Sequence, residues 1–186
     1  MRSLFRLSRP WRATCTPSFS PKRLRWKRQR KTGLLPDIVD KETRSRMMSG
    51  IRGKNTKPEL VIRKGLHARG FRFRLHSSKV PGKPDLVLPR YRAAIFVHGC
   101  FWHSHDCHLF KMPSTRPDFW KAKLARNRER DEEIRKSLLD AGWRVLVIWE
   151  CALKGKYRIN LDELFTKVTA WIRGDDLEGE IAGRPV

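Results

Sequence analysis

Three short apolar segments constrain the fold of this chain more than any other feature. Each is flanked by turn residues and has the length and composition of a strand buried in a sheet. These segments cover residues 85–88, 93–97 and 143–149. Residues 71–75 alternate apolar and basic side chains, which predicts a half-exposed strand. Helices are expected at 56–70, at about 118–140 and at 161–172. This order predicts one α/β domain built around a sheet.

The composition indicates a polyanionic partner. The chain has 186 residues, with 42 Lys and Arg against 19 Asp and Glu, so its net charge is +23. Such an excess is typical of proteins that bind nucleic acid or an anionic membrane surface. No apolar run approaches the roughly 20 residues of a membrane span, and no apolar segment near Met1 indicates a secretory signal. The four cysteines are therefore interpreted as thiols or metal ligands in a reducing compartment.

Both ends of the chain differ from the patterned region. Residues 1–36 contain 11 Lys and Arg, no acidic residue and four prolines, which predicts a disordered basic arm. Two alternatives are an organelle transit peptide and a translation start placed too early, since Met47 and Met48 follow. Residues 174–186 predict a flexible acidic C-terminal tail.

A cluster of metal-ligand residue types follows the second apolar segment. Cys100, His105 and Cys107 share one loop, and Cys151 directly follows the strand predicted at 143–149. Three thiolates and one imidazole form a closed tetrahedral shell for Zn²⁺, so the site would be structural. His103 and His108 are alternative imidazole ligands, and unpaired thiols with a surface histidine are the alternative to a metal site.

Catalytic residue types lie on both sides of this loop. Asp85 begins a strand after a turn, a common place for a ligand of Mg²⁺, although Pro-Asp is ordinary in turns. The acid and lysine that complete a PD-(D/E)xK nuclease signature are absent at the next strand, which ends Val97-His98-Gly99. A neutral histidine, His98 or His103, could instead act as the base for water.

The long helix carries a polar residue in an apolar stripe. The stripe consists of Trp120, Leu124, Asn127, Asp131, Ile134 and Leu138. Asp131 could orient a catalytic imidazole, or it could form a salt bridge with a nearby arginine. Phe101 and Trp102 could enter a base stack or simply cover the sheet edge. Glu59 completes a capping box with Thr56, and this capping role by itself accounts for a glutamate at position 59.

Several of these motifs together resemble the very-short-patch repair mismatch endonucleases of bacteria. The resemblance runs from about residue 37 to 155 and rests on motifs that occur in this chain in the following order. They are Asp40-Lys41-x-Thr43-Arg44-Ser45, Pro81-Gly82-Lys83-Pro84-Asp85, His98-Gly99-Cys100-Phe101-Trp102-His103-x-His105-x-Cys107, Phe119-Trp120, Asn127-x-Glu129-Arg130-Asp131 and Gly142-Trp143-Arg144-Val145-Leu146-x-x-Trp149-Glu150-Cys151-Ala152-Leu153.

The resemblance implies a restriction-endonuclease-like domain over residues 37–173 with a mixed sheet flanked by helices. It implies nicking of one strand on the 5′ side of the T in a T:G mismatch left by deamination of 5-methylcytosine. The family roles carried over are as follows: Mg²⁺ at Asp85 with the Val97 carbonyl; active-site residues His98, His103, Asp131 and Glu59; structural Zn²⁺ at Cys100, His105, Cys107 and Cys151; and DNA-wedging rings Phe101, Trp102 and Trp120. Val97 replaces a Thr usual in the family, although its carbonyl oxygen is retained.

The expected setting follows from the same resemblance. The partner would be double-stranded DNA with a T:G mismatch, together with other mismatch-repair proteins, and the enzyme would be a monomer in the bacterial cytoplasm, associated with the nucleoid. Two other functions remain open: a nuclease of a restriction or mobile-element system with the same fold, and a zinc-stabilised DNA-binding module without catalysis. The retained Asp85, His98, His103 and Asp131 argue against the second, because binding alone needs none of them.

Overall fold

The computed structural model describes residues 40–50 and 53–185. The basic arm predicted at 1–36 lies outside the described residues. None of the described helices combines the length and the apolar character that crossing a bilayer requires.

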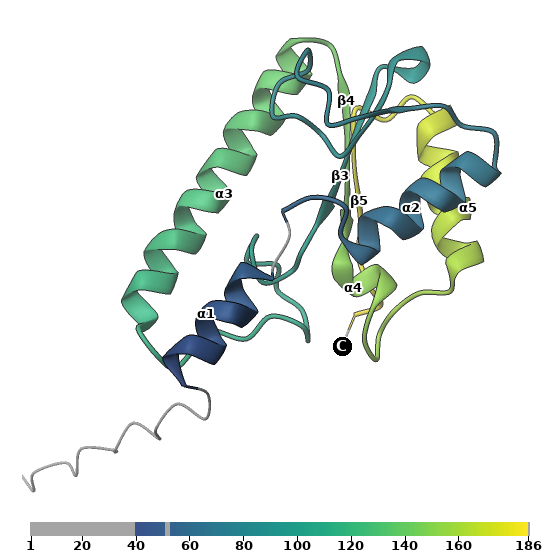
Figure 1. Cartoon of the computed structure of the whole chain (residues 1–186). Helices are drawn as coiled ribbons and strands as arrows, with labels where there is room; N and C mark the ends of the chain where they lie inside the picture. The colour runs from purple at the N-terminus through teal and green to yellow at the C-terminus, as the bar shows by residue number, and fades with distance from the viewer. Residues whose placement is uncertain (1–39, 51–52, 186) are drawn as a thin grey trace, which may run out of the picture. The chain divides into compact units, whose positions relative to one another are not determined.

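A five-stranded mixed sheet forms the centre of the structure (Figure 1). Its strands are β1 (Arg74–Leu75), β2 (Leu86–Leu88), β3 (Ala93–His98), β4 (Arg144–Trp149) and β5 (Glu178–Ile181), and they lie in the order β1-β2-β3-β4-β5. The first three strands are antiparallel, whereas β3, β4 and β5 are parallel. The carboxyl ends of β3 and β4 therefore lie side by side, with His98 opposite Trp149.

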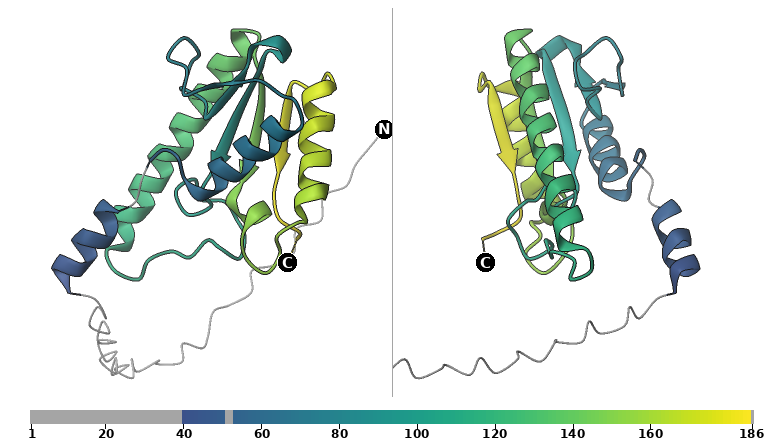
Figure 2. Two further views of the ribbon diagram at one scale, coloured as in Figure 1. Left: turned by 45° about the vertical axis from the view of Figure 1, so that its right-hand side comes forward. Right: turned by 90° about the vertical axis from the view of Figure 1, so that its left-hand side faces the viewer.

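Helices cover both faces of the sheet. The described helical segments are α1 (Lys41–Ser49), α2 (Lys57–Ala68), a 3-10 turn η1 (Pro89–Tyr91), α3 (Pro117–Asp140), α4 (Glu150–Leu153) and α5 (Leu161–Arg173). Figures 1 and 2 show α2 and α5 on one face and the long α3 on the opposite face. The helices predicted at 56–70, 118–140 and 161–172 are confirmed within one or two residues at each end.

Alternation along the central strands divides the core into two layers. Ile95 of β3 and Leu146 of β4 pack with Ile62 of α2 on one face. On the other face, Ala94 and Val145 pack against the last turns of α3. Because successive side chains of a strand point to opposite faces, both layers are apolar, as expected for strands buried on two sides.

The turn before β2 depends on a glycine. Gly82 has a φ of +71°, and a Cβ at this position would lie 2.2 Å from Cγ2 of Ile134 on α3. Only glycine adopts this conformation at such a close approach without strain. The turn brings the chain under α3 and delivers Asp85 to the start of β2.

Two sequence-based predictions require correction. The strand predicted at 71–75 is reduced to Arg74–Leu75, because its partner β2 ends at Leu88 and Pro89 starts a 3-10 turn that leads the chain away. The predicted flexible tail, 174–186, contains β5, which pairs in parallel with β4 and buries Ile181 to 7 % exposure. Its polar, four-residue sequence carries no strand signal, so the pairing comes from the exposed edge of β4.

Candidate active site and metal centre

Asp85 lies at the start of β2, where the antiparallel pairing with β3 brings it beside Val97. The Val97 backbone N–H donates to Oδ2 of Asp85 at 2.8 Å. On the other side of the carboxylate, Oδ1 lies 3.7 Å from Nδ1 of His76. Burial raises the pKa of Asp85; the Val97 N–H opposes that rise and the nearby Glu59 carboxylate reinforces it. A bound cation would offset both the burial of the Asp85 carboxylate and its repulsion by Glu59, so the donor set fits a divalent metal.

Glu59 reaches the same place from α2. Its Oε1 accepts a hydrogen bond from the Thr56 hydroxyl at 2.9 Å, and the predicted capping box is present. Its Oε2 accepts from the guanidinium of Arg63 at 2.6 Å, one helical turn further on. Glu59 and Arg63 are only 3 % and 7 % exposed. Glu59 is thus a helix cap and also a buried charge at the metal-binding side of the cleft.

His98, His103 and Asp131 form a second cluster. Nδ1 of His103 lies 2.5 Å from Oδ2 of Asp131, so the stripe residue on α3 pairs with an imidazole. The salt bridge to arginine, the alternative for Asp131, is not found among the described residues. The His98 and His103 rings stack with centroids 3.8 Å apart and planes 4° apart. Burial, reinforced by His103, lowers the pKa of His98 to about 3, so His98 is a neutral imidazole at neutral pH.

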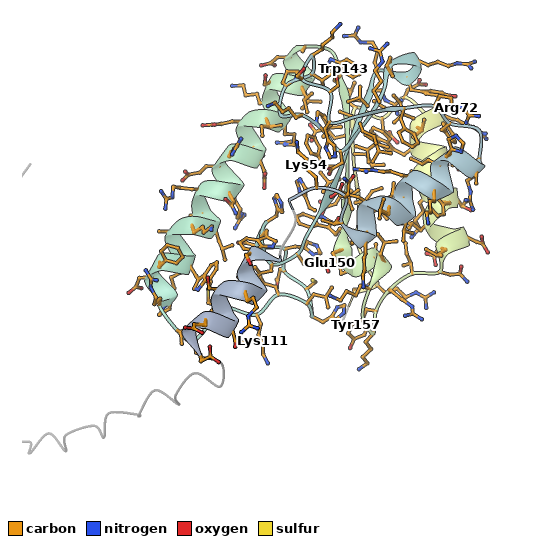
Figure 3. The ribbon with its side chains drawn as sticks, viewed as in Figure 1. Lys54, Arg72, Lys111, Trp143, Glu150 and Tyr157 are labelled. Carbon is orange, nitrogen blue, oxygen red and sulfur yellow. The ribbon has the colours of Figure 1, made fainter. Side chains whose placement is uncertain are left out.

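One cleft of about 670 Å³ joins the two clusters. Its walls include Glu59, Asp85, His98, His103 and Asp131, together with Trp102, Asn127 and Glu150. In Figure 3, Glu150 marks the place where β4 runs into α4, at the end of the parallel strands. Carboxylates, imidazoles and an open cleft are the components of a metal-assisted hydrolytic site.

The predicted zinc ligands also converge. Ligand atoms of Cys100, His105, Cys107 and Cys151 all lie within 4.8 Å of one another, because the parallel pairing of β3 with β4 places the Cys100 loop next to Cys151. Burial raises the pKa of the Cys100 and Cys151 thiols and lowers that of His105. Three free thiols and a neutral imidazole at this spacing suit a tetrahedral zinc ion, whose charge would favour thiolates. His105 supplies the imidazole of this cluster; His103 is engaged by Asp131 instead.

Groups from β4 and the C-terminal segment surround this cysteine cluster. The ring of Trp149 stacks on His105 at 4.1 Å between centroids, and its indole N–H donates to Glu180 of β5. The backbone N–H of Gly183 donates to the Cys151 sulfur at 3.3 Å. The region predicted to be a flexible tail therefore packs against the metal-ligand cluster.

The three predicted DNA-wedging rings lie together at the start of α3. Phe101 contacts Trp102 and Trp120 with ring centroids 5.1 and 5.3 Å apart, and Lys123 lies over both tryptophans. The loop is tied to α3 by Asn127, which donates to the Trp102 carbonyl at 2.8 Å. None of these rings belongs to the two core layers of the described sheet. They form a half-buried aromatic cluster outside the core.

Comparison with known proteins identifies the family. The profile described as DNA mismatch endonuclease Vsr matches residues 36–109. The chain is 42 % identical over 147 residues to the DNA mismatch endonuclease Vsr of Escherichia coli strain K12, covering 79 % of this chain and 94 % of that protein. The chain belongs to the Vsr family of DNA mismatch endonucleases.

Relatives of the Vsr family also include proteins named as nicking enzymes. The type II nicking enzyme V.XorIIP of Xanthomonas oryzae is 45 % identical over 119 residues, which is 64 % of this chain and 88 % of the relative. The type II nicking enzyme V.NmeAIP of Neisseria meningitidis is 43 % identical over 122 residues, or 66 % and 87 % of the two chains. The resemblance inferred from the sequence motifs is confirmed.

Two residues of this Vsr-family site were not predicted. His76 follows β1 and faces Asp85, and Arg63 binds Glu59 inside the protein. The pairing of Glu59 with Arg63 could have been anticipated from their i, i+4 spacing. The location of His76 could not, because it depends on the antiparallel pairing of β1 with β2.

Proposed function

We propose that this chain is a Mg²⁺-dependent DNA endonuclease of restriction-endonuclease-like fold. In this proposal it nicks one strand on the 5′ side of the T in T:G mismatches that arise from deaminated 5-methylcytosine, and so starts very short patch repair. The observation that carries the proposal is the single cleft lined by Asp85, His98, His103 and Asp131. Chromosomal DNA as substrate would associate the enzyme with the nucleoid in the bacterial cytoplasm, next to other mismatch-repair proteins.

The catalytic roles follow from the hydrogen bonds and charges of the cleft. Asp85, with the Val97 carbonyl as a second ligand, would hold the magnesium ion. The positive charge of the bound ion would stabilise the negative charge that develops on the phosphate during hydrolysis. His103 uses Nδ1 to bind Asp131, which leaves Nε2 free to take a proton from the attacking water. As the water oxygen bonds to phosphorus, the bond from phosphorus to the leaving oxygen breaks, and that oxygen takes up a proton from solvent water.

The two histidines have different roles in this scheme. The pKa of His98 is lowered to about 3, so His98 is a neutral hydrogen-bonding group rather than a cation beside the phosphate. Asp131 contacts Nδ1 of His103 and so orients the ring, which favours His103 as the base. Glu59 supports the metal side of the cleft through its negative charge and its bond to Arg63.

The remaining predicted residues support DNA binding and the shape of the site. Structural zinc at Cys100, His105, Cys107 and Cys151 would hold the loop that carries the active-site histidines. Phe101, Trp102 and Trp120 would enter the base stack at the mismatch, where unstacking is least costly. We propose that a single copy of the chain acts on the duplex.

The decisive experiment is a nicking assay on duplexes that differ at one position only, with T:G, C:G or T:A. We expect Mg²⁺-dependent nicking of the T:G duplex alone. Asp85→Ala should abolish nicking and retain DNA binding, whereas Asp140→Ala, at an exposed position on α3, should leave nicking unchanged. Full activity of Asp85→Ala with Mg²⁺ would refute the metal assignment.

A double-mutant comparison tests the proposed base. His103→Ala and Asp131→Asn should each slow nicking strongly, and the double variant should be little slower than His103→Ala alone, because the two residues act as a unit. Additive losses would remove Asp131 from this role while leaving Asp85 in place.

One alternative is favoured by a specific observation. Five relatives are named type II nicking enzymes, which suggests a nuclease partnered with a restriction and modification system. Such an enzyme would still nick DNA, and the T:G arm of the assay performed in different surrounding sequences would reveal its sequence preference. A DNA-binding module without catalysis would nick none of the three duplexes.

A further inference from the structure

Arg63 and His76 form a partly buried bridge between two acidic residues of the cleft, Glu59 and Asp85. Nη2 of Arg63 lies 2.6 Å from Glu59 Oε2 and 3.0 Å from Nε2 of His76. On the far side of its ring, Nδ1 of His76 lies 3.7 Å from Asp85 Oδ1. The His76 side chain is 18 % exposed and that of Arg63 9 %. A charged side chain is rarely buried this far unless it binds a specific partner.

The contact with Arg63 determines which nitrogen of His76 carries the proton. A guanidinium has only N–H donors and accepts no hydrogen bond, so Nε2 of His76 must present its lone pair to Nη2. A neutral imidazole has one N–H, which must then be on Nδ1. Nδ1 is the nitrogen that faces Asp85.

We propose that His76 is a positioning residue that orients the Asp85 carboxylate with its Nδ1–H and is itself no metal ligand. This deepens the proposed function and rests on Asp85 as the metal-holding residue. The Val97 N–H donates a hydrogen bond to Oδ2 at 2.8 Å. Nδ1 of His76 lies 3.7 Å from Oδ1, longer than a hydrogen bond, so His76 approaches the carboxylate from the side opposite Val97 and would donate to it after a small shift. Because the same guanidinium also binds Glu59, the bridge couples the orientations of the two acids.

The competing interpretation is direct ligation. Glu59, His76 and Asp85 offer three ligand atoms within 4.8 Å of one another, as a metal site would. A metal-bound nitrogen cannot carry a proton, so ligation by Nδ1 would require Nε2–H. That proton would point at the N–H groups of Arg63, 3.0 Å away. The position of Arg63 therefore opposes ligation and favours the orienting role.

The first test identifies the tautomer of His76 and does not depend on nicking activity. Long-range ¹H–¹⁵N NMR spectra of the full-length ¹⁵N-labelled protein at mildly alkaline pH distinguish Nδ1–H from Nε2–H, and the spectrum of His76→Asn assigns the His76 signal. We expect Nδ1–H both without and with saturating MgCl₂. An Nε2–H tautomer in either condition would overturn the proposal, and a change to Nε2–H on adding Mg²⁺ would assign His76 as a ligand.

The second test compares three substitutions in single-turnover nicking of the T:G duplex. Asparagine places an amide N–H where Nδ1 lies, whereas glutamine places its amide where Nε2 lies. His76→Ala and His76→Gln should lose about 10–100-fold in rate, the range seen for residues that orient metal ligands, and His76→Asn should recover most of that loss. Affinity for the duplex without Mg²⁺ should be unchanged in all three.

Controls separate folding, function and position. His67→Asn, at an exposed site on α2, should match the wild type, and melting temperatures check that each variant folds. A folded His76→Asn as slow as His76→Ala would overturn the proposal. If the wild type itself failed to nick the T:G duplex, the proposed function would be wrong, while the tautomer measurement would still decide the role of His76 toward Asp85.

Discussion

Replacing His98 by glutamine should make the fold less sensitive to acid. His98 ends β3 with its ring against the rings of Phe96, His103 and Trp149. Burial, reinforced by His103, lowers its pKa to about 3 in the folded protein, whereas its ordinary value is 6.5. Between these two values the unfolded chain binds a proton on His98 and the folded protein does not. Acid therefore favours unfolding in this range.

The size of the effect follows from the two pKa values. A shifted group contributes up to about 1.4 kcal/mol per pH unit between them. From pH 7 to pH 5 the free energy of unfolding of the wild type should fall by about 2 kcal/mol more than that of His98→Gln. Acid lowers the free energy of unfolding because the pKa of His98 is lowered in the folded protein. The stability contributed by neutral His98 is fully present above pH 6.5 and is lost as the pH falls toward 3.

Urea unfolding of both proteins at the two pH values measures this difference. The cost of altered packing in the variant is the same at each pH, and the titration of other groups cancels in the comparison. His67→Gln, an identical change at an exposed position, should track the wild type. If the wild type and His98→Gln lost equal stability between pH 7 and pH 5, the pKa of His98 in the folded protein would have its ordinary value. His98 would then take up a proton in the cleft as the pH falls to 5.

Four further predictions address the metal, the arm, the rings and the C-terminal strand. Cys151→Ser should release bound zinc and destabilise the fold, as metal analysis and thermal melting would detect; a zinc-free wild type of normal stability would rule out the site. Deleting residues 1–36 should flatten the salt dependence of DNA binding and keep the T:G preference, because phosphate contacts do not read sequence; loss of the preference would give the arm a different role. Trp102→Ala should weaken binding to mismatched duplex more than to matched duplex, and equal losses would indicate packing only. Ile181→Ala should cost about 2 kcal/mol in denaturant unfolding, since Ile181 is 7 % exposed; a negligible loss would return this segment to a flexible tail.

Much of the domain could be predicted from local patterns. The helix at 57–68 was recognisable from its cap, and α3 from the period of its stripe. The residue types Cys100, His105, Cys107 and Cys151 predicted a metal site, and the sequence motifs indicated the family. These features depend on residues close together in the chain, where backbone geometry and side-chain type act directly.

Features that depend on pairing between distant segments were missed. Strand β5 forms because the edge of β4 offers hydrogen-bonding partners to an acidic segment with almost no strand signal of its own. Strand β1 is shortened because its partner ends at Pro89. In both cases the partner strand, rather than the propensity of the segment, sets its structure.

The chemistry of the cleft divides in the same way. Residue types alone suggested separate candidate roles for Asp85, His98, His103 and Asp131, and the family resemblance predicted that all four belong to one hydrolytic site. The tertiary structure then paired His103 with Asp131 and brought His76 to Asp85. The lowered pKa of His98 likewise comes from its surroundings, because desolvation and neighbouring charges act through space across segments far apart in the sequence.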